Sequence, residues 1–301
     1  MINSIFFTFI QRVLSILPLL YISLCQASLE QASPLPKLTA REQAWMNTHP
    51  HVRVGGSLDW TPFNFVNASG QYSGIANDYL QLISQKTGLN FTPSISQWSD
   101  NLEKIRHNKI DLLPAVYFTE ERSQYLTYSP PYFEVLDYFF IRDDLNAKTL
   151  ADLNGKRVAI PESYAHIKLI KKHFPKIKIV IVNTFGDAID AVLENRADLL
   201  YDTYGALSYT LEKEGINTII PFKSTRKLGK NSIHIVTRKD NPALSAIIQK
   251  GLNAITAKEK RNIYNKWLGS TAKSNLHLKL TEQESNWITA HPVIRFTGDP
   301  S

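Results

Sequence analysis

The chain has 301 residues, of which 43% are hydrophobic and 20% are charged, so it can bury a large core and is not a disordered segment. Its formal net charge is +7, but the densest basic run, residues 168 to 178, is interleaved with apolar residues, as on the solvated face of a helix and a strand. A globular protein is therefore predicted. Attraction to anionic solutes or lipid headgroups stays open, and a nucleic-acid partner is not expected.

The N-terminus has the pattern of a secretory signal peptide. Arg12 precedes an apolar run over residues 13 to 24, and Cys25-Gln26-Ala27 offers small residues for cleavage after Ala27. We expect residues 1–27 to be removed and the mature chain to reach the periplasm. An uncleaved anchor over residues 5 to 24 is the alternative, and the bulky Leu24 argues against a lipoprotein. Because Cys25 is the only cysteine, the mature chain is expected to hold no disulfide.

A linker and a short preface helix are expected over residues 28–50. Thr39 and Glu42 are spaced as a capping box for a helix over residues 39 to 47, and His49-Pro50 ends it.

The following residues alternate strand and helix patterns, which predicts an α/β fold with mostly parallel sheets flanked by helices. In the first set, strands are expected over 51–55, 91–95, 111–115 and 138–141, and helices over 78–86, capped by Asp78, and from 99 or 100 to 107. In the second set, a helical turn is expected over 150–153, strands over 155–160, 177–182 and 198–201, and helices over 164–174 and 185–194. A strand over 233–237 and helices over 242–257 and 259–267 close the domain.

This order predicts two lobes joined by two chain crossings. Lobe 1 is expected to hold residues 51–142 and 229–269, and lobe 2 residues 146–228. A hinge of this kind places a ligand cleft between the lobes.

One sequence pattern occurs twice. Leu38-Thr39, Glu42, Trp45 and His49-Pro50 recur 242 positions later as Leu280-Thr281, Glu284, Trp287 and His291-Pro292, and Arg53 is matched by Arg295. A period of this length repeats a whole domain rather than one supersecondary unit. We therefore expect residues 276–301 to begin a second, truncated domain, and the natural chain to continue beyond residue 301.

Six motifs of the first copy follow one another as in a known family. They are Val52-Arg53-Val54-Gly55, Trp60-Thr61-Pro62-Phe63, Gly74-Ile75-Ala76-Asn77-Asp78, Asp111-Leu112-Leu113-Pro114, Thr119-Glu120-Glu121-Arg122 and Tyr128-Ser129-Pro130-Pro131-Tyr132. Residues 38 to 269 thereby resemble the bacterial solute-binding proteins of family 3, the Venus-flytrap periplasmic-binding type, and residues 150 to 158 resemble the entry to that family's second lobe. The resemblance implies a two-lobe fold with two hinge crossings.

The tandem arrangement resembles the periplasmic region of sensor proteins, usually hybrid histidine kinases and sometimes diguanylate cyclases. It implies a signal-input module with a small-molecule ligand, a second flytrap domain in the same chain and a homodimeric full-length sensor. An amino-acid-binding protein of an ABC transporter is the alternative. A flytrap-fold enzyme such as a dehydratase is the third hypothesis.

The resemblance also implies where a ligand would bind. Arg122 matches the family arginine that grips a carboxylate, a task that suits the planar guanidinium fork. Asp202 matches an aspartate placed against an amino-acid ammonium group. Each residue also has a simpler interpretation without a ligand. Arg122 could be a surface residue paired with Glu120 or Glu121, and Asp202 could be a turn residue that ends a strand.

Six further residues are expected at the ligand site. Phe63 is assigned to the ligand face and Trp60 mainly to packing, although either ring could form an aromatic wall. Thr119 and Tyr117 flank Arg122, and Ser163 and Tyr164 lie at a strand-to-helix turn that can bind an anion, with Ser163 as the helix N-cap.

One position near the expected aromatic wall departs from the family pattern. Position 57 is a serine here, whereas the family often has an aspartate there. This difference suggests a domain that closes without ligand, as in some tandem sensors.

No enzymatic pattern is found in the sequence. The eight histidines show no metal-ligand spacing beyond the isolated His49-x-His51, and there is no nucleophile elbow, phosphate loop or cysteine nucleophile. No catalytic residue, metal or cofactor is therefore predicted for residues 1–301.

Overall fold

The computed structural model describes residues 35–228, 231–269 and 281–290. The expected signal peptide and most of the expected second domain lie outside the described residues. Among the described residues, no helix combines the length and the apolar character that a bilayer crossing requires.

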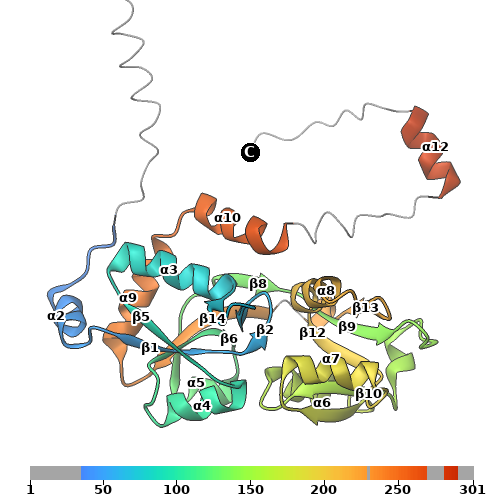
Figure 1. The fold of residues 1–301 in the computed structure, drawn as a ribbon, viewed down its shortest axis with the longest axis horizontal. Coiled ribbons are helices and arrows are strands. Elements are labelled where there is room, and N and C mark those ends of the chain that lie inside the picture. The colour runs from blue at the N-terminus through green and yellow to red at the C-terminus, as the bar shows by residue number, and fades with distance from the viewer. Residues whose placement is uncertain (1–34, 229–230, 270–280, 291–301) are drawn as a thin grey trace, which may run out of the picture.

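Lobe 1 is built on a six-stranded sheet in the order β5-β1-β6-β14-β7, with β8 also paired to β14 (Figure 1). Its strands are β1 (Val52–Gly56), β5 (Phe91–Ile95), β6 (Leu112–Tyr117), β7 (Leu126–Tyr128), β8 (Phe133–Val135) and β14 (Asn231–Arg238). Its helices are α2 (Ala40–Thr48), α3 (Ile75–Thr87), α4 (Trp98–Arg106), α5 (Glu120–Ser123), α9 (Pro242–Asn253) and α10 (Ala257–Leu268). A small sheet of β2 (Asp59–Trp60), β3 (Asn64–Val66) and β4 (Tyr72–Ser73) leads into α3.

Lobe 2 is built on a five-stranded sheet in the order β11-β10-β12-β9-β13. Its strands are β9 (Asp137–Arg142), β10 (Arg157–Pro161), β11 (Lys178–Val182), β12 (Leu199–Thr203) and β13 (Ile219–Ser224). Its helices are α6 (Ala165–His173), α7 (Phe185–Leu193) and α8 (Tyr204–Lys213), with 3₁₀ turns at Leu150–Leu153 and Arg226–Leu228. The predicted two-lobe α/β architecture is thus confirmed.

The strands next to the hinge make both sheets mixed rather than mostly parallel. In lobe 1, β1 is parallel to β5 and β6, but β14 is antiparallel to β6, β7 and β8. In lobe 2, β10 is parallel to β11 and β12, but β9 is antiparallel to β12 and β13. Strands β9 and β14 each enter their lobe from the other one, and they arrive in the opposite direction to the βαβ strands.

The first chain crossing lies earlier than expected. β8 pairs with β14 of lobe 1, whereas β9 pairs with β12 of lobe 2, so the chain crosses at Leu136. The expected boundary at residue 142 was wrong, because the apolar strand pattern of residues 138–141 gives no indication of which sheet the strand joins. The second crossing lies between β13 and β14.

The start of α3 also differs from its prediction. The helix begins at Ile75, and its first backbone N–H groups are satisfied by other parts of the chain: Ile75 N donates to Pro62 O and Ala76 N to Phe63 O, both at 2.9 Å. Asp78 is therefore not the cap. It lies in the first turn, where its carboxylate accepts hydrogen bonds from Lys266 Nζ (2.8 Å) and Trp267 Nε1 (2.7 Å) of α10.

The preface helix α2 is attached to lobe 1. The predicted capping box of Thr39 and Glu42 is present, and Glu42 also accepts a 2.7 Å hydrogen bond from Lys250 of α9. The second copy of the pattern is helical too: α12 (Glu282–Ala290) covers the residues that the 242-residue offset assigns to it.

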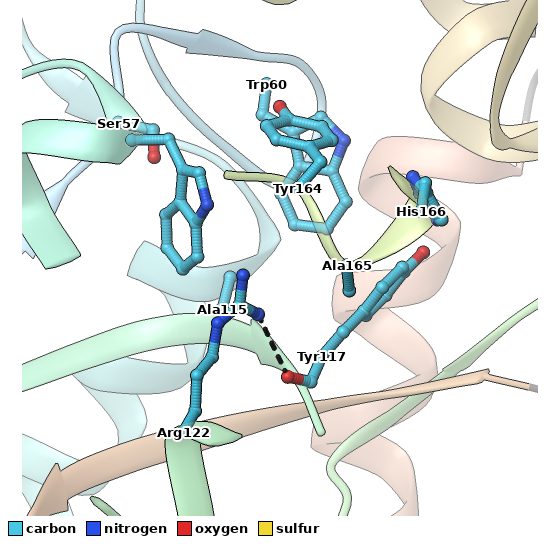
Figure 2. A pocket seen from close by; sticks show the side chains of 9 residues that line it. Ser57, Trp60, Ala115, Tyr117, Arg122, Tyr164, Ala165 and His166 are labelled. Carbon is cyan, nitrogen blue, oxygen red and sulfur yellow. Dashed lines mark hydrogen bonds between the residues drawn. The ribbon is translucent and has the colours of Figure 1, made fainter. Parts of the chain in front are cut away.

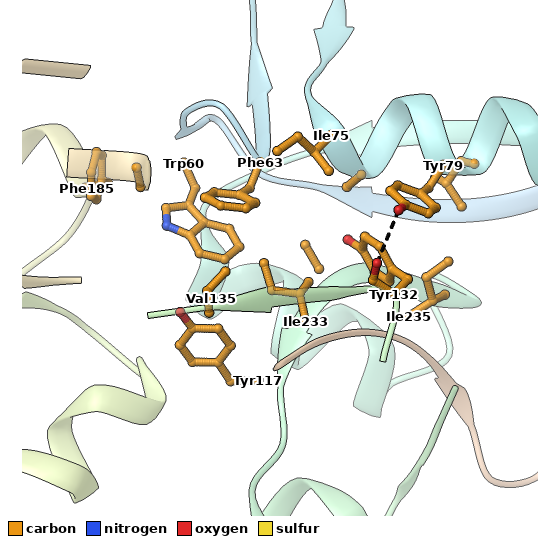
Figure 3. Packing of buried hydrophobic residues seen from close by; sticks show 14 of the residues in the cluster. Trp60, Phe63, Ile75, Tyr79, Tyr117, Tyr132, Val135, Phe185, Ile233 and Ile235 are labelled. Atoms are coloured by element: carbon orange, nitrogen blue, oxygen red, sulfur yellow. Dashed lines mark hydrogen bonds between the residues drawn. The ribbon is translucent and has the colours of Figure 1, made fainter. Parts of the chain in front are cut away.

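The sheet of lobe 1 is covered on both faces. Leu112 belongs to a core cluster with Ile75 of α3 and Ile247 of α9, whereas the next residue, Leu113, belongs to a cluster with Leu102 of α4. The first cluster continues along the hinge to Trp60, Phe63 and, in lobe 2, Phe185 (Figure 3). The core thus extends to the interface of the lobes, where the candidate site lies.

Candidate functional site

A cavity of about 40 Å³, here called the inner cavity, lies between the two lobes. It is lined by Ser57, Trp60, Trp98, Ala115, Tyr117 and Arg122 of lobe 1 and by Tyr164, Ala165 and His166 of lobe 2 (Figure 2). A buried water needs about 10–15 Å³ by a comparable measure, so the inner cavity has room for a few water molecules. It is smaller than an amino acid requires in this closed arrangement.

Arg122 lies at the edge of the inner cavity and is the most buried cation of the site. The short helix α5 carries it, with Thr119 Oγ1 accepting from Arg122 N, and the side chain is 6% exposed. Its Nη1 donates to Tyr117 O (3.3 Å) and its Nη2 to Ser163 O (2.6 Å), and the guanidinium lies over the Trp98 ring.

No carboxylate of the described residues forms an ion pair with Arg122. Glu121, the expected surface partner, instead contacts Lys168 at 2.5 Å and Arg106 at 3.3 Å. Burial lowers the pKa of the Arg122 guanidinium, which still remains charged at neutral pH. A buried cation that is held only by carbonyl oxygens favours the approach of an anion.

Asp202 lies on β12 and is 3% exposed. Its Oδ1 accepts hydrogen bonds from Trp60 Nε1 of lobe 1 (3.2 Å) and from Thr203 N (2.6 Å), whereas Oδ2 has no partner among the described residues. Burial raises the pKa of Asp202 to about 6. The carboxylate does not line the inner cavity, whereas the Trp60 indole that donates to it does.

His166 and Asp137 form a second buried polar pair near Asp202. His166 Nε2 lies 3.3 Å from Asp137 Oδ2, and both side chains are almost fully enclosed. Asp137 also accepts from Tyr117 Oη (3.1 Å) and from Asn231 Nδ2. Although burial lowers the pKa of His166, the facing Asp137 carboxylate raises it above its ordinary value.

The two aromatic residues of the expected wall lie at different depths. Trp60 packs into the core as predicted and also lines the inner cavity. Phe63 lies behind Trp60, with ring centroids 4.9 Å apart, and packs edge-on against Phe133. Phe63 is 1% exposed and does not line the inner cavity, so its predicted position on the ligand face is not seen in this arrangement.

Thr119, Ser163 and Tyr164 lie near Arg122 as expected, but Ser163 acts through a different atom. Ser163 has a positive φ of 62°, and its carbonyl accepts from Arg122 Nη2 and from Trp98 Nε1 (3.2 Å). The N-cap of α6 is Tyr164, without a side-chain cap. The prediction that the Ser163 hydroxyl caps this helix was therefore wrong.

Ser57 contributes a neutral hydroxyl to the wall of the inner cavity. Its Oγ accepts from Asn64 Nδ2 (3.2 Å) and its N–H donates to Asn64 Oδ1 (3.1 Å). This wall therefore lacks the negative charge that an aspartate would supply.

Besides the hydrogen bonds that Tyr117 and Asn231 donate to Asp137 next to the hinge, five hydrogen bonds among the described residues join the lobes across the cleft, and we call these five the closure contacts. They are Trp60 Nε1 to Asp202 Oδ1 (3.2 Å), Gly186 N to Asp59 Oδ2 (2.9 Å), Arg122 Nη2 to Ser163 O (2.6 Å), Trp98 Nε1 to Ser163 O (3.2 Å) and Lys168 Nζ to Glu121 Oε2 (2.5 Å). Asp59 lies at the N-terminus of α7, where a carboxylate is favoured by the helix dipole, although burial raises its pKa.

The sequence did not identify four residues of this region: Asp59, Trp98, Asp137 and His166. Two signals were available. Asp59 directly precedes the Trp60 motif, and His166 falls in the first turn of the predicted helix over 164–174. Trp98 and Asp137 carry no local signal, because their partners lie far away in the chain: Ser163 and Arg122 for Trp98, and Tyr117, His166 and Asn231 for Asp137. Among the described residues, no three His, Cys, Asp or Glu side chains are grouped as metal ligands.

Comparisons with known proteins agree with this architecture. The chain is 29% identical over 237 residues to the virulence sensor protein BvgS of Bordetella pertussis, a match that covers 78% of this chain and 19% of BvgS. It is 23% identical over 208 residues to ABC transporter arginine-binding protein 1 of Escherichia coli, covering 68% of this chain and 85% of that protein. The crystal structure of the BvgS periplasmic domain of B. pertussis superposes with a TM-score of 0.74 at 27% identity, over 80% of this chain and 47% of that one.

These relatives are sensor and solute-binding proteins, and the chain spans about a fifth of the length of BvgS. The model of the bacterial extracellular solute-binding proteins, family 3, matches residues 52–270, which is most of the chain and includes both lobes and the hinge. The chain therefore belongs to the family 3 bacterial extracellular solute-binding proteins.

Proposed function

We propose that this chain is the periplasmic ligand-sensing module of a transmembrane signalling protein of the histidine-kinase type. In this proposal an amino acid or a similar small solute binds between the lobes and shifts the equilibrium between their arrangements. The similarity to BvgS and the repeated preface helix support a sensor. A transport-associated binding protein is the alternative. The complete reading frame distinguishes the two, since a sensor requires a membrane helix and an output domain.

The observation that carries the ligand proposal is Arg122. A buried guanidinium at the lobe interface, held by two carbonyl oxygens and by no carboxylate of the described residues, is suited to bind the carboxylate of a ligand. The arginine-binding relative makes L-arginine a natural member of the ligand panel. Asp202 as the partner of the ammonium group stays a prediction.

Replacing Arg122 by methionine is expected to abolish ligand binding. Thermal unfolding of the full chain against the 20 L-amino acids should reveal a ligand that stabilises the wild-type protein by about 2.7 kcal/mol at 100 times its Kd. Arg122→Met should lose this stabilisation because no other guanidinium lines the inner cavity, and the nearby Arg106 is engaged by Glu103 and Glu121. Arg53→Met, which removes an exposed arginine paired with Asp111, is the matched control. An unchanged stabilisation of Arg122→Met would rule out the carboxylate role.

A second function is favoured by the closure contacts. In it, the domain closes through its own side chains and signals when these contacts are broken, as the neutral Ser57 first suggested. Trp60→Phe keeps an aromatic ring but removes the indole N–H that reaches Asp202. We expect the radius of gyration from small-angle X-ray scattering to increase in Trp60→Phe, and Phe65→Leu to serve as a control for aromatic loss away from the cleft. Identical scattering of Trp60→Phe and wild type would contradict closure through this contact.

The remaining parts of the proposal concern the complete protein. Export to the periplasm, a second flytrap domain beginning near residue 276 and a homodimeric sensor would follow from the tandem arrangement. No catalytic role is proposed for residues 1–301, and any enzymatic output would lie in another domain.

A further inference from the structure

A larger crevice lies at the mouth of the cleft, on the other side of Arg122 from the inner cavity. It has a volume of about 410 Å³ and lies between α4 and α5 of lobe 1 and the start of α6 of lobe 2. Figure 1 shows these helices facing each other on the side of the molecule away from the hinge. The volume is in the range of small-molecule sites, about 300–1,000 Å³. We call this space the outer crevice.

Arg122 separates the two spaces. Together with Tyr164 and Ala165 it lines both the inner cavity and the outer crevice. The inner cavity has room for only a few water molecules. In the closed arrangement, a carboxylate that is attached to anything larger can therefore reach the guanidinium only from the outer crevice.

The charged side chains of the outer crevice are not equally engaged. Arg106 contacts Glu103 at 2.7 Å and Glu121 at 3.3 Å, and Lys168 contacts Glu121 at 2.5 Å, so these four charges are compensated at the rim. Two charges are left. Arg122 has no carboxylate partner, and Glu162, exposed and next to Ser163 in the chain, has no ion-pair partner in the described part of the chain.

We propose that the outer crevice is a binding site for a zwitterionic amino acid, with the ligand carboxylate on Arg122 and its ammonium group on Glu162. This proposal rests on the proposed function and changes the partner of the ammonium group from Asp202 to Glu162. Arg122 belongs to lobe 1 and Glu162 to lobe 2, so a ligand held by both bridges the lobes at the mouth of the cleft. Asp202 does not line the outer crevice, and its Oδ1 accepts from Trp60 of lobe 1 and from Thr203.

The test compares two carboxylates of lobe 2 in the full chain. The 20 L-amino acids are screened by thermal unfolding, and the Kd of the most stabilising one is measured by titration calorimetry on wild type, Glu162→Gln, Asp202→Asn and Arg122→Met. Glu162→Gln should weaken binding at least tenfold, because the neutral amide removes the charge that strengthens the hydrogen bond to the ligand ammonium group. Asp202→Asn should change the Kd by less than about twofold, which is the variation expected from a substitution that does not contact the ligand. Asp190→Asn, which removes an exposed carboxylate of α7 away from the outer crevice, is the matched control.

Each other outcome has a separate meaning. Loss of binding in Asp202→Asn, with Glu162→Gln unaffected, overturns the outer site and leaves the proposed function intact. Binding that survives Arg122→Met overturns the outer site and the carboxylate role of Arg122, but not amino-acid binding by the chain. If no amino acid stabilises the wild-type chain, the amino-acid part of the proposed function fails, and the outer site fails with it. Ile167→Trp, which fills the outer crevice without removing a charge, should also weaken binding, and an unchanged Kd in this variant contradicts the site independently of Glu162.

Discussion

Replacement of Gly74 by alanine is expected to destabilise the domain by roughly 3 kcal/mol or more, because the backbone conformation and the space around this residue both exclude a side chain. Gly74 has φ +117° and ψ 176°, a region that only glycine enters readily. A Cβ atom would also lie 2.6 Å from Phe63 O and 2.9 Å from Pro62 O, which are backbone atoms.

The effect should extend to the ligand site. The carbonyl groups of Pro62 and Phe63 accept the first N–H groups of α3, and the same loop carries Trp60. A displaced loop would move the Trp60 indole away from Asp202 and remove one of the closure contacts. We therefore expect Gly74→Ala to lower both the midpoint of urea unfolding and the affinity for any ligand of the cleft.

Gly70 provides the control for this prediction. It also has a positive φ, +77°, but an added Cβ would meet no atom within 4 Å. Gly70→Ala should therefore lower the free energy of unfolding only by the cost of holding alanine at a positive φ, about 1–2 kcal/mol. Equal losses of stability in the two variants would show that the contact with the Phe63 backbone is not important.

The stability of the domain is expected to rise as the pH falls from 7 to 5. Burial raises the pKa of Asp202 to about 6, above the ordinary value of 3.8, so the folded state binds a proton before the unfolded state does. The free energy of unfolding then increases as the pH falls through 6 toward 4, by about 1–3 kcal/mol. His166 acts in the same direction. Because its pKa is raised in the folded state, it stabilises the domain below pH 6.5, and this stabilisation is lost as the pH rises through the pKa of the folded state.

Other carboxylates limit this increase. The pKa of Asp111 is lowered by Arg53 and that of Asp198 by Arg157, even though burial acts against both shifts. Their contribution is present above the ordinary aspartate pKa and is lost as the pH falls below about 4. We therefore expect maximal stability near pH 5 rather than at neutral pH.

Urea unfolding between pH 4.5 and 8 measures this dependence. Asp202→Asn cannot ionise and should flatten the curve between pH 5 and 7, whereas Asp190→Asn, exposed on α7, should leave its slope unchanged. Wild-type and Asp202→Asn curves that run parallel would exclude Asp202 as the source. His166→Gln then tests whether the histidine alone produces the slope.

If the two proposals hold, the closure contacts and the outer crevice would give the chain two ways to respond to a ligand. A ligand changes the arrangement of the lobes only to the extent that it binds one arrangement more tightly than the other. A carboxylate is a stronger acceptor for Arg122 than the Ser163 carbonyl, because the hydrogen bonds are charge-assisted on both sides. A carboxylate held by Arg122 and not by lobe 2 would loosen the closure, whereas an amino acid that also reaches Glu162 would preserve it.

The sequence by itself determined the class of fold, the repeat and the main secondary structure. The strands β1, β5, β6 and β10 and the helices α6, α7 and α9 lie within a few residues of their predicted bounds, because each has its own apolar period and its own start and stop signals. The capping box of Thr39 and Glu42 and the 3₁₀ turn at Leu150–Leu153 were predictable for the same local reason. Arg122 could be identified from its motif.

Only the tertiary structure decided which elements meet. The helix α8 and the strand β13 were not predicted, and β9 was assigned to the wrong lobe, because pairing partners far apart in the chain leave no local pattern. The start of α3 depends on carbonyl groups of another loop, and which of Trp60 and Phe63 lines the inner cavity depends on where that loop packs. Local preferences fix the elements, whereas burial and hydrogen bonding across the hinge decide which side chains face the cleft, and these energies exist only once both lobes are in contact.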